Sequence, residues 1–176
     1  MNPALQPLRN EHKALLANIE DLRSVADVAG EVPEGLLRRG LRDACHFLLG
    51  MVIPQLEAEA RALFPRVAGL LGDSMATAPM EQDLAEIRRL TGVLRELNSR
   101  EDGVATSMED RMTLRCALYG LYILIPLHLR KEEDLYFSLL EHRLDPVEVH
   151  RLFREMDTQR DTSDGEPRGG TGERPA

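Results

Sequence analysis

The chain has 176 residues, which is enough for one domain with a sizeable core. Hydrophobic residues make up 43% and aromatic residues 4%, with no Trp, and the abundance of Leu, Ala, Glu and Arg favours an all-helical domain. A formal net charge of −8 disfavours binding to nucleic acid or to an anionic membrane surface, because both need a basic partner.

The sequence pattern gives no sign of export or of membrane insertion. The N-terminal stretch has no basic start followed by an apolar core, so no signal peptide is predicted. The longest apolar run, residues 118–127, is shorter than the about 20 residues that span a bilayer. Cys45 and Cys116 lack the spacing of a metal site, and we expect both thiols to be reduced. These features predict a cytoplasmic protein that binds neither nucleic acid nor membrane.

The first predicted helix ends near Ala29 and Gly30. Its inward positions recur at alternating steps of three and four residues, which is the spacing of a helix face buried in a core. These positions are Leu5, Leu8, His12, Leu15, Ile19 and Leu22. His12 is the polar exception on an otherwise apolar face.

The second predicted helix covers residues 33–71 and repeats this exception. Its inward face is predicted to contain Leu37, Leu41, Ala44, Leu48, Val52, Gln55, Glu59 and Ala62. Gln55 and Glu59 are polar and four residues apart, one turn along the same face. His46 precedes Gln55 by nine residues, which places it on the opposite side of a regular helix. We therefore expect His46 to be a surface or inter-helix residue and not a ligand.

The third predicted helix covers residues 80–97, with Met80, Leu84, Ile87, Leu90 and Leu94 inward. A fourth helix is predicted from a Ser107 cap to His142, and a short fifth from Asp145 to Met156. The short loops favour an all-α, up-down-up-down four-helix bundle with an extra C-terminal helix, occupying residues 1–156. Residues 157–176 are polar and rich in Gly and Pro, and are predicted to be a disordered tail.

The inward face of the fourth helix carries a second polar pair. Its predicted positions are Leu114, Leu118, Leu121, Ile125, His128, Glu132, Leu135 and Leu139. An unpaired carboxylate taken out of water costs several kcal/mol, which is comparable with the net stability of a domain. Glu132 should therefore meet a partner inside the core, and a metal ion is one candidate.

The polar inward residues are predicted to converge. In an up-down-up-down bundle, His12, Gln55, Glu59, His128 and Glu132 lie toward the same end, at levels that agree within about two turns at ~1.5 Å per residue. Two imidazoles and two carboxylates from three helices are donors that suit iron, manganese or zinc. The pattern therefore predicts a metal site formed by His12, Glu59, His128 and Glu132.

This set of residues resembles the hemerythrin family in its HHE cation-binding form, over about residues 8–142. The resemblance rests on RNEHKALL around His12, IPQLEAEARALFP around Glu59, MEQDLAEIRRL around Leu84 and HLRKEEDLYFSLL around His128 and Glu132. It implies a four-helix bundle that holds two irons, with His12, Glu59, His128 and Glu132 matching family ligands. The family functions implied are oxygen binding, the sensing or chemistry of oxygen, peroxide or nitric oxide, and iron sensing.

Two positions depart from the family pattern: Gln55 and Leu84 stand where histidines are expected. If positions 55 and 84 both served one ion, that ion would lose its imidazole ligands. The side of the site with His12 and His128 would keep its imidazoles. Asp83, beside Leu84, is expected to point about 100° away from the site and not to replace it.

Three outcomes follow from these two departures. The first is a two-iron site completed by water, the second a single-ion site using the two histidines with one or both glutamates, and the third a metal-free relic. The resemblance implies a non-haem iron protein, for which dioxygen or another small oxidant is a candidate ligand. The alternative is a metal-free interaction or regulatory bundle, and whether the protein is an enzyme stays open.

Overall fold

The computed structural model describes residues 5–101, 103–105 and 107–163, with side chains up to residue 158. Within this part of the chain the regular structure is helical and contains no strand, which confirms the all-helical prediction. The elements are α1 Gln6–Ala17, α2 Ile19–Val28, α3 Glu34–Phe47, η2 Leu48–Val52, α4 Ile53–Leu71, α5 Ala78–Ser99, α6 Met108–Lys131, η3 Glu132–Phe137, α7 Ser138–Arg143 and α8 Pro146–Ser163.

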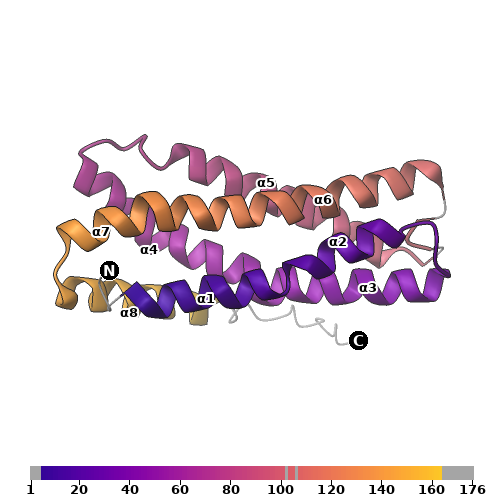
Figure 1. The fold of residues 1–176 in the computed structure, drawn as a ribbon, viewed down its shortest axis with the longest axis horizontal. Coiled ribbons are helices and arrows are strands. Elements are labelled where there is room, and N and C mark those ends of the chain that lie inside the picture. The colour runs from indigo at the N-terminus through magenta and orange to yellow at the C-terminus, as the bar shows by residue number, and fades with distance from the viewer. Residues whose placement is uncertain (1–4, 102, 106, 164–176) are drawn as a thin grey trace, which may run out of the picture.

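The helices lie lengthwise beside one another (Figure 1). α1 and α2 follow each other along the molecule, α3 and α4 return beside them, and α5 and α6 lie alongside. α6 packs against both α2 and α5, and α8 packs against α4. α7 and α8 lie at the end of the molecule where α1 begins, so the C-terminal helix covers that end of the bundle (Figure 1).

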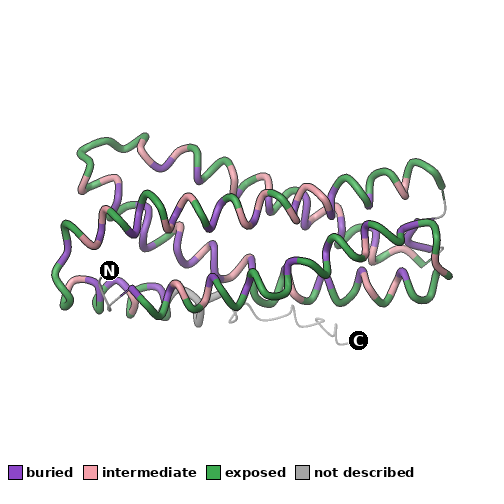
Figure 2. Tube along the Cα trace, in the orientation of Figure 1, coloured by how far each residue is buried: buried purple, intermediate pink, exposed green. Residues whose placement is uncertain are grey.

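Buried residues alternate with exposed ones along the long helices (Figure 2) and form two apolar clusters. The larger cluster, formed mainly by α2, α3, α5 and α6, includes Leu15, Leu22, Leu41, Leu56, Leu84, Leu94, Leu118, Ile125 and Leu129. The terminal cluster, closed by α8, includes Leu8, Ala62, Phe64, Tyr136, Phe137, Leu140, Val149, Leu152 and Met156. Along α1, α4 and α6–η3, the buried polar residues lie where members of the larger cluster give way to members of the terminal cluster.

Most predicted helix ends are observed, and two of them have a clear local cause. The side chain of Ser107 accepts a hydrogen bond from the Asp110 amide and the Asp110 side chain accepts one from the Ser107 amide, forming a capping box at the start of α6. Gly72 ends α4 with φ of 67°, a left-handed conformation that glycine adopts at little cost. The first predicted helix is divided at Asn18 into α1 and α2.

The C-terminal helix is longer than predicted. α8 continues to Ser163, beyond the predicted end at Met156. Val149, Leu152 and Met156 are buried in the terminal cluster, so this helix is part of the core. Residues 164–176 lie outside the described part of the chain, and the disorder expected for them stays a prediction.

The π-helical turn η3 overturns one predicted core position. Leu135 was expected to face inward, but 61% of its surface is exposed, while Tyr136, Phe137 and Leu140 are buried. A π-helical turn contains more residues than an α-helical turn, so the buried face after Glu132 shifts along the chain. A constant helical period cannot anticipate this shift.

The continuous helix Met108–Arg143 is long and apolar enough to cross a membrane, judged by length and composition alone. Leu118, Leu121 and Ile125 on this helix are buried against the other helices, which is the placement of a core helix in a bundle. Core helices of soluble proteins can meet the same length and composition criteria, so these criteria alone do not assign this helix to a membrane.

Candidate metal centre

Four polar side chains meet in the layer between the two apolar clusters. His12 comes from α1, Glu59 from α4, His128 from α6 and Glu132 from the start of η3, and each is 0% exposed. Each occupies a position on the inward face of its helix, which the flanking leucines and other apolar residues hold against the core. The structure therefore brings together all four residues that the sequence predicts.

His12 contacts both carboxylates through one ring nitrogen. Its Nε2 atom lies 3.2 Å from Oε1 of Glu59 and 3.5 Å from Oε2 of Glu132. Ligand atoms of these three residues all lie within 4.8 Å of one another. Two donors bound to one transition-metal ion at about 2.1 Å are separated by about 3 Å, so this group has nearly the spacing of a coordination shell.

Glu132 also connects the two histidines. Its Oε1 atom lies 3.5 Å from Nε2 of His128, while Oε2 faces His12. His128 is not part of the tight three-residue group, but it lies directly beside one of its carboxylates. The aromatic rings of Phe137 and Phe64 lie near His12 and His128, with centroid distances of 5.2 and 6.4 Å.

Several buried polar atoms of the site have no hydrogen-bond partner among the described residues. They are Oε2 of Glu59, both carboxylate oxygens of Glu132 and both ring nitrogens of His128. An unsatisfied buried polar atom costs about 1–3 kcal/mol, and more if the group is charged. A bound cation would satisfy the oxygens and one imidazole nitrogen at the same time, so the residues present fit a metal ion.

The site shifts the pKa values of its groups in different directions. Burial alone would lower the pKa of His12, but hydrogen bonds to Glu59 and Glu133 and their negative charges outweigh burial and raise it. Burial lowers the pKa of His128, with partial opposition from Glu59 and Asp83. Burial, followed by the charge of Glu59, raises the pKa of Glu132 well above its usual value. Protons therefore compete with a metal ion for both His12 and Glu132.

Carboxylates also lie beside the outer ring nitrogens of the two histidines, and the sequence analysis missed both contacts. Oε1 of Glu133 lies 3.0 Å from Nδ1 of His12, and Oδ2 of Asp83 lies 3.5 Å from Nδ1 of His128. Asp83 therefore lies closer to the site than expected, but it contacts the outer nitrogen of His128 and does not take the place of the missing histidine. Because α5 packs closely against α6, a residue flanking the inward face of α5 still reaches the side of His128.

Gln55 acts as a hydrogen-bond donor in this structure. Its Nε2 atom donates to Oε1 of Glu59 at 2.5 Å and to Oε2 of Glu11 at 2.8 Å. An amide N–H group cannot bind a metal ion, so Gln55 in this orientation holds a ligand instead of being one. Leu84, at the other departure from the family pattern, is buried in the larger apolar cluster.

The two departures from the family pattern lie on different helices, Gln55 on α4 and Leu84 on α5. Gln55 lies on the Glu59 side, next to His12, whereas Asp83, the neighbour of Leu84, contacts His128. The sequence left open the case in which both losses fall on one ion and leave the His12 and His128 side intact. The contacts of Gln55 and Asp83 instead favour one lost histidine near each remaining histidine.

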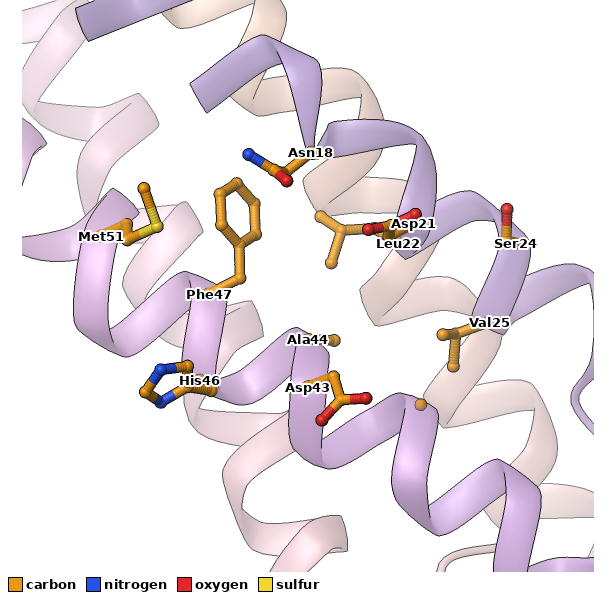
Figure 3. A pocket seen from close by; sticks show the side chains of 11 residues that line it. Asn18, Asp21, Leu22, Ser24, Val25, Asp43, Ala44, His46, Phe47 and Met51 are labelled. Atoms are coloured by element: carbon orange, nitrogen blue, oxygen red, sulfur yellow. The ribbon is translucent and has the colours of Figure 1, made fainter. Parts of the chain in front are cut away.

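His46 lies outside this site, as predicted. It is exposed and lines a groove of about 480 Å³ between α2 and α3, together with Asp21, Phe47 and Met51. Figure 3 shows these side chains around the groove, with His46 on α3. The turn η2 lies between His46 and Gln55, and the buried face still continues from Leu48 to Glu59.

Comparison with known proteins agrees with this geometry. The family model for the hemerythrin HHE cation-binding domain matches residues 4–140. Searches of curated proteins and of solved structures gave no match. The matched segment contains α1 to η3 and all four buried polar residues of the site. The chain belongs to the hemerythrin HHE cation-binding domain family.

Proposed function

We propose that this protein is an up-down-up-down hemerythrin-like bundle that binds one divalent transition-metal ion, iron in the cell, in its buried polar layer. His12 Nε2, Glu59 and Glu132 would hold the ion, and His128, beside Glu132, would be the fourth ligand. The observation that carries this proposal is the set of unsatisfied oxygens on two fully buried carboxylates. A carboxylate in the core needs a positive partner, and a divalent cation provides it for both.

The donor set favours a single ion of intermediate hardness. Two carboxylates and two imidazoles suit iron, manganese and zinc, whereas the absence of thiolate ligands disfavours metals that prefer sulfur. Gln55 and Leu84 stand where the family has histidines. Two ions would therefore share only two imidazoles and two carboxylates, which is a small number of ligands for two ions. When bound, iron with an open coordination position supplies binding or redox chemistry toward dioxygen, peroxide or nitric oxide.

The chain's own residues would prepare this site in three ways. Gln55 fixes the carboxylate of Glu59 by donating a hydrogen bond to it. Phe64 and Phe137 line the two imidazoles and keep water from the layer. The burial of all four ligands restricts entry to small molecules. We further propose a cytoplasmic location, for which the two free cysteines are the support.

Metal analysis combined with an absorption spectrum tests this function. Full-length protein is reconstituted with ferrous iron without oxygen, desalted and assayed for iron per chain. We expect about one iron per chain and no oxo-bridge absorption band after exposure to air. About two irons with such a band would replace the single-ion site by a two-iron site, and no retained metal would refute metal binding.

A metal-free regulatory bundle is the second candidate, and one observation favours it. The ion pair between His12 and Glu59 already gives one buried carboxylate a partial positive partner, because the pKa of His12 is raised. In that case the polar layer would be a structural relic of the family. Glu132 would then be protonated, as its raised pKa allows.

A further inference from the structure

One helical turn surrounds the ring of His12 on several sides. Glu132, the first residue of η3, approaches Nε2 at 3.5 Å, and Glu133, the next residue, approaches Nδ1 at 3.0 Å. Phe137, the last residue of η3, lies against the ring with a centroid distance of 5.2 Å. The inner nitrogen of His12 therefore faces the buried carboxylates, and the outer nitrogen faces Glu133.

The hydrogen bond at one ring nitrogen of His12 determines which nitrogen is free to bind a metal ion. A neutral histidine carries one proton, so one ring nitrogen donates a hydrogen bond and the other has a free electron pair. An acceptor on Nδ1 keeps the proton there and leaves the electron pair on Nε2 for a metal ion. Glu133 is such an acceptor, because its Oε1 atom lies within hydrogen-bond distance of Nδ1.

Glu133 is itself positioned from α1. Nη1 of Arg9 lies 3.7 Å from Oε2 of Glu133, and Nη2 of Arg9 lies 3.1 Å from Glu141. The Arg9 guanidinium also lies over the ring of Phe137, at 5.2 Å from its centroid. Arg9 precedes His12 by three residues on the same helix, so one face of α1 supplies both the imidazole and the cation that holds its acceptor.

The equivalent contact at His128 is weaker. Asp83 lies 3.5 Å from Nδ1 of His128, and this nitrogen has no hydrogen bond among the described residues. Asp83 is instead paired with Lys131, whose Nζ atom lies 2.7 Å away. Of the two histidines, His12 alone has its outer nitrogen hydrogen-bonded to a carboxylate in the described part of the chain.

We propose that Glu133 is a positioning residue that holds the Nδ1–H group of His12 and directs its Nε2 atom to the metal ion. Glu133 is not a ligand: it contacts the outer nitrogen, and 33% of its side chain is exposed. This inference rests on the proposed metal site and deepens it. It assigns His12 a fixed orientation that His128 lacks.

Cobalt(II) titration of the full-length chain tests the assignment. The variants are Glu133→Ala, Glu133→Gln, which keeps a neutral acceptor, and Asp134→Ala. Asp134 is an exposed carboxylate at the next position, so its loss matches the charge change without touching His12. We expect Glu133→Ala to weaken cobalt binding about 10–100-fold, Glu133→Gln to weaken it less, and Asp134→Ala to leave it unchanged.

Proton NMR of the cobalt-loaded proteins separates orientation from general stability. The hyperfine-shifted Nδ1–H signal of His12 should be observed in wild type and in Asp134→Ala, and should exchange faster with water in Glu133→Ala. Equal affinity and equal exchange in Glu133→Ala and wild type would overturn the inference while leaving metal binding intact. Failure of wild type to bind cobalt would refute the proposed function and this inference with it.

Discussion

The polar layer and the larger apolar cluster lie on the same helices but differ in how each part is stabilised. Around Leu22, Leu41 and Leu118, the core is hydrocarbon and needs no partner to be stable. About three to five turns away along the same faces, His12, Glu59, His128 and Glu132 are just as deeply buried and include unsatisfied polar atoms. The apolar cluster therefore maintains the fold, and the polar layer is held in place by it at a local cost in stability.

Substitutions in the apolar cluster should give the largest effect. Leu118 is fully buried, so Leu118→Ala removes buried hydrocarbon and leaves a cavity. We expect the free energy of unfolding to fall by about 2–5 kcal/mol, measured with denaturant in the presence of a chelator. Iron per folded chain should not change. A variant that lost metal as well would show that the two regions are not separable.

Substitution of a metal ligand should have the opposite effect, lowering metal binding more than the stability of the metal-free fold. His128→Ala should lower iron per chain and abolish the metal-dependent stabilisation, which is about 2.7 kcal/mol when the metal concentration is 100 times the Kd. His46→Ala, at an exposed histidine in the groove, is the matched control and should retain both. Thermal unfolding with and without ferrous iron measures the difference. Equal losses in the two variants would mean that binding does not occur in the polar layer.

The amount by which the polar layer lowers the free energy of unfolding should depend on pH. The pKa of Glu132 is raised in the folded protein, so its contribution to stability is complete below the unfolded pKa near 4.5 and is lost as pH rises toward the folded pKa. In metal-free protein, Glu132→Gln should become more stable than wild type as pH rises. The difference should grow by at most about 1.4 kcal/mol per pH unit.

Urea unfolding of wild type and Glu132→Gln at several pH values, with chelator present, measures this difference in stability. Below pH 4.5 the two stabilities should converge, because the wild-type carboxyl is then protonated in both states. A difference that stayed constant with pH would show that folding does not shift the pKa of Glu132. Adding metal should reverse the order, because the variant loses a ligand.

The smallest effect is expected at the C-terminus. Removal of residues after Met156 keeps Val149, Leu152 and Met156, which are the buried residues of α8 in the terminal cluster. The free energy of unfolding should change by no more than about 0.5 kcal/mol, which thermal unfolding can measure. A larger drop would extend the domain beyond the boundary that the sequence predicts.

Local sequence rules anticipated most of the fold. The spacing of apolar residues identified the inward faces of α1, α3–α4 and α5, and the Ser107 cap and the predicted helix end at residue 71 match helix ends that are observed. They failed after Glu132, where η3 changes the helical phase and exposes Leu135. The extra residue in a π-helical turn depends on packing against neighbouring helices, which the spacing of one segment does not contain.

The sequence by itself determined that polar groups stand on three otherwise apolar helix faces, because helical periodicity is a local property of each segment. Only the tertiary structure decided which of these groups meet and through which atoms. Gln55 donates to Glu59, Asp83 reaches His128, and Glu133 holds the outer nitrogen of His12. These contacts depend on the separation and rotation of packed helices to within about an ångström, and side-chain packing sets both.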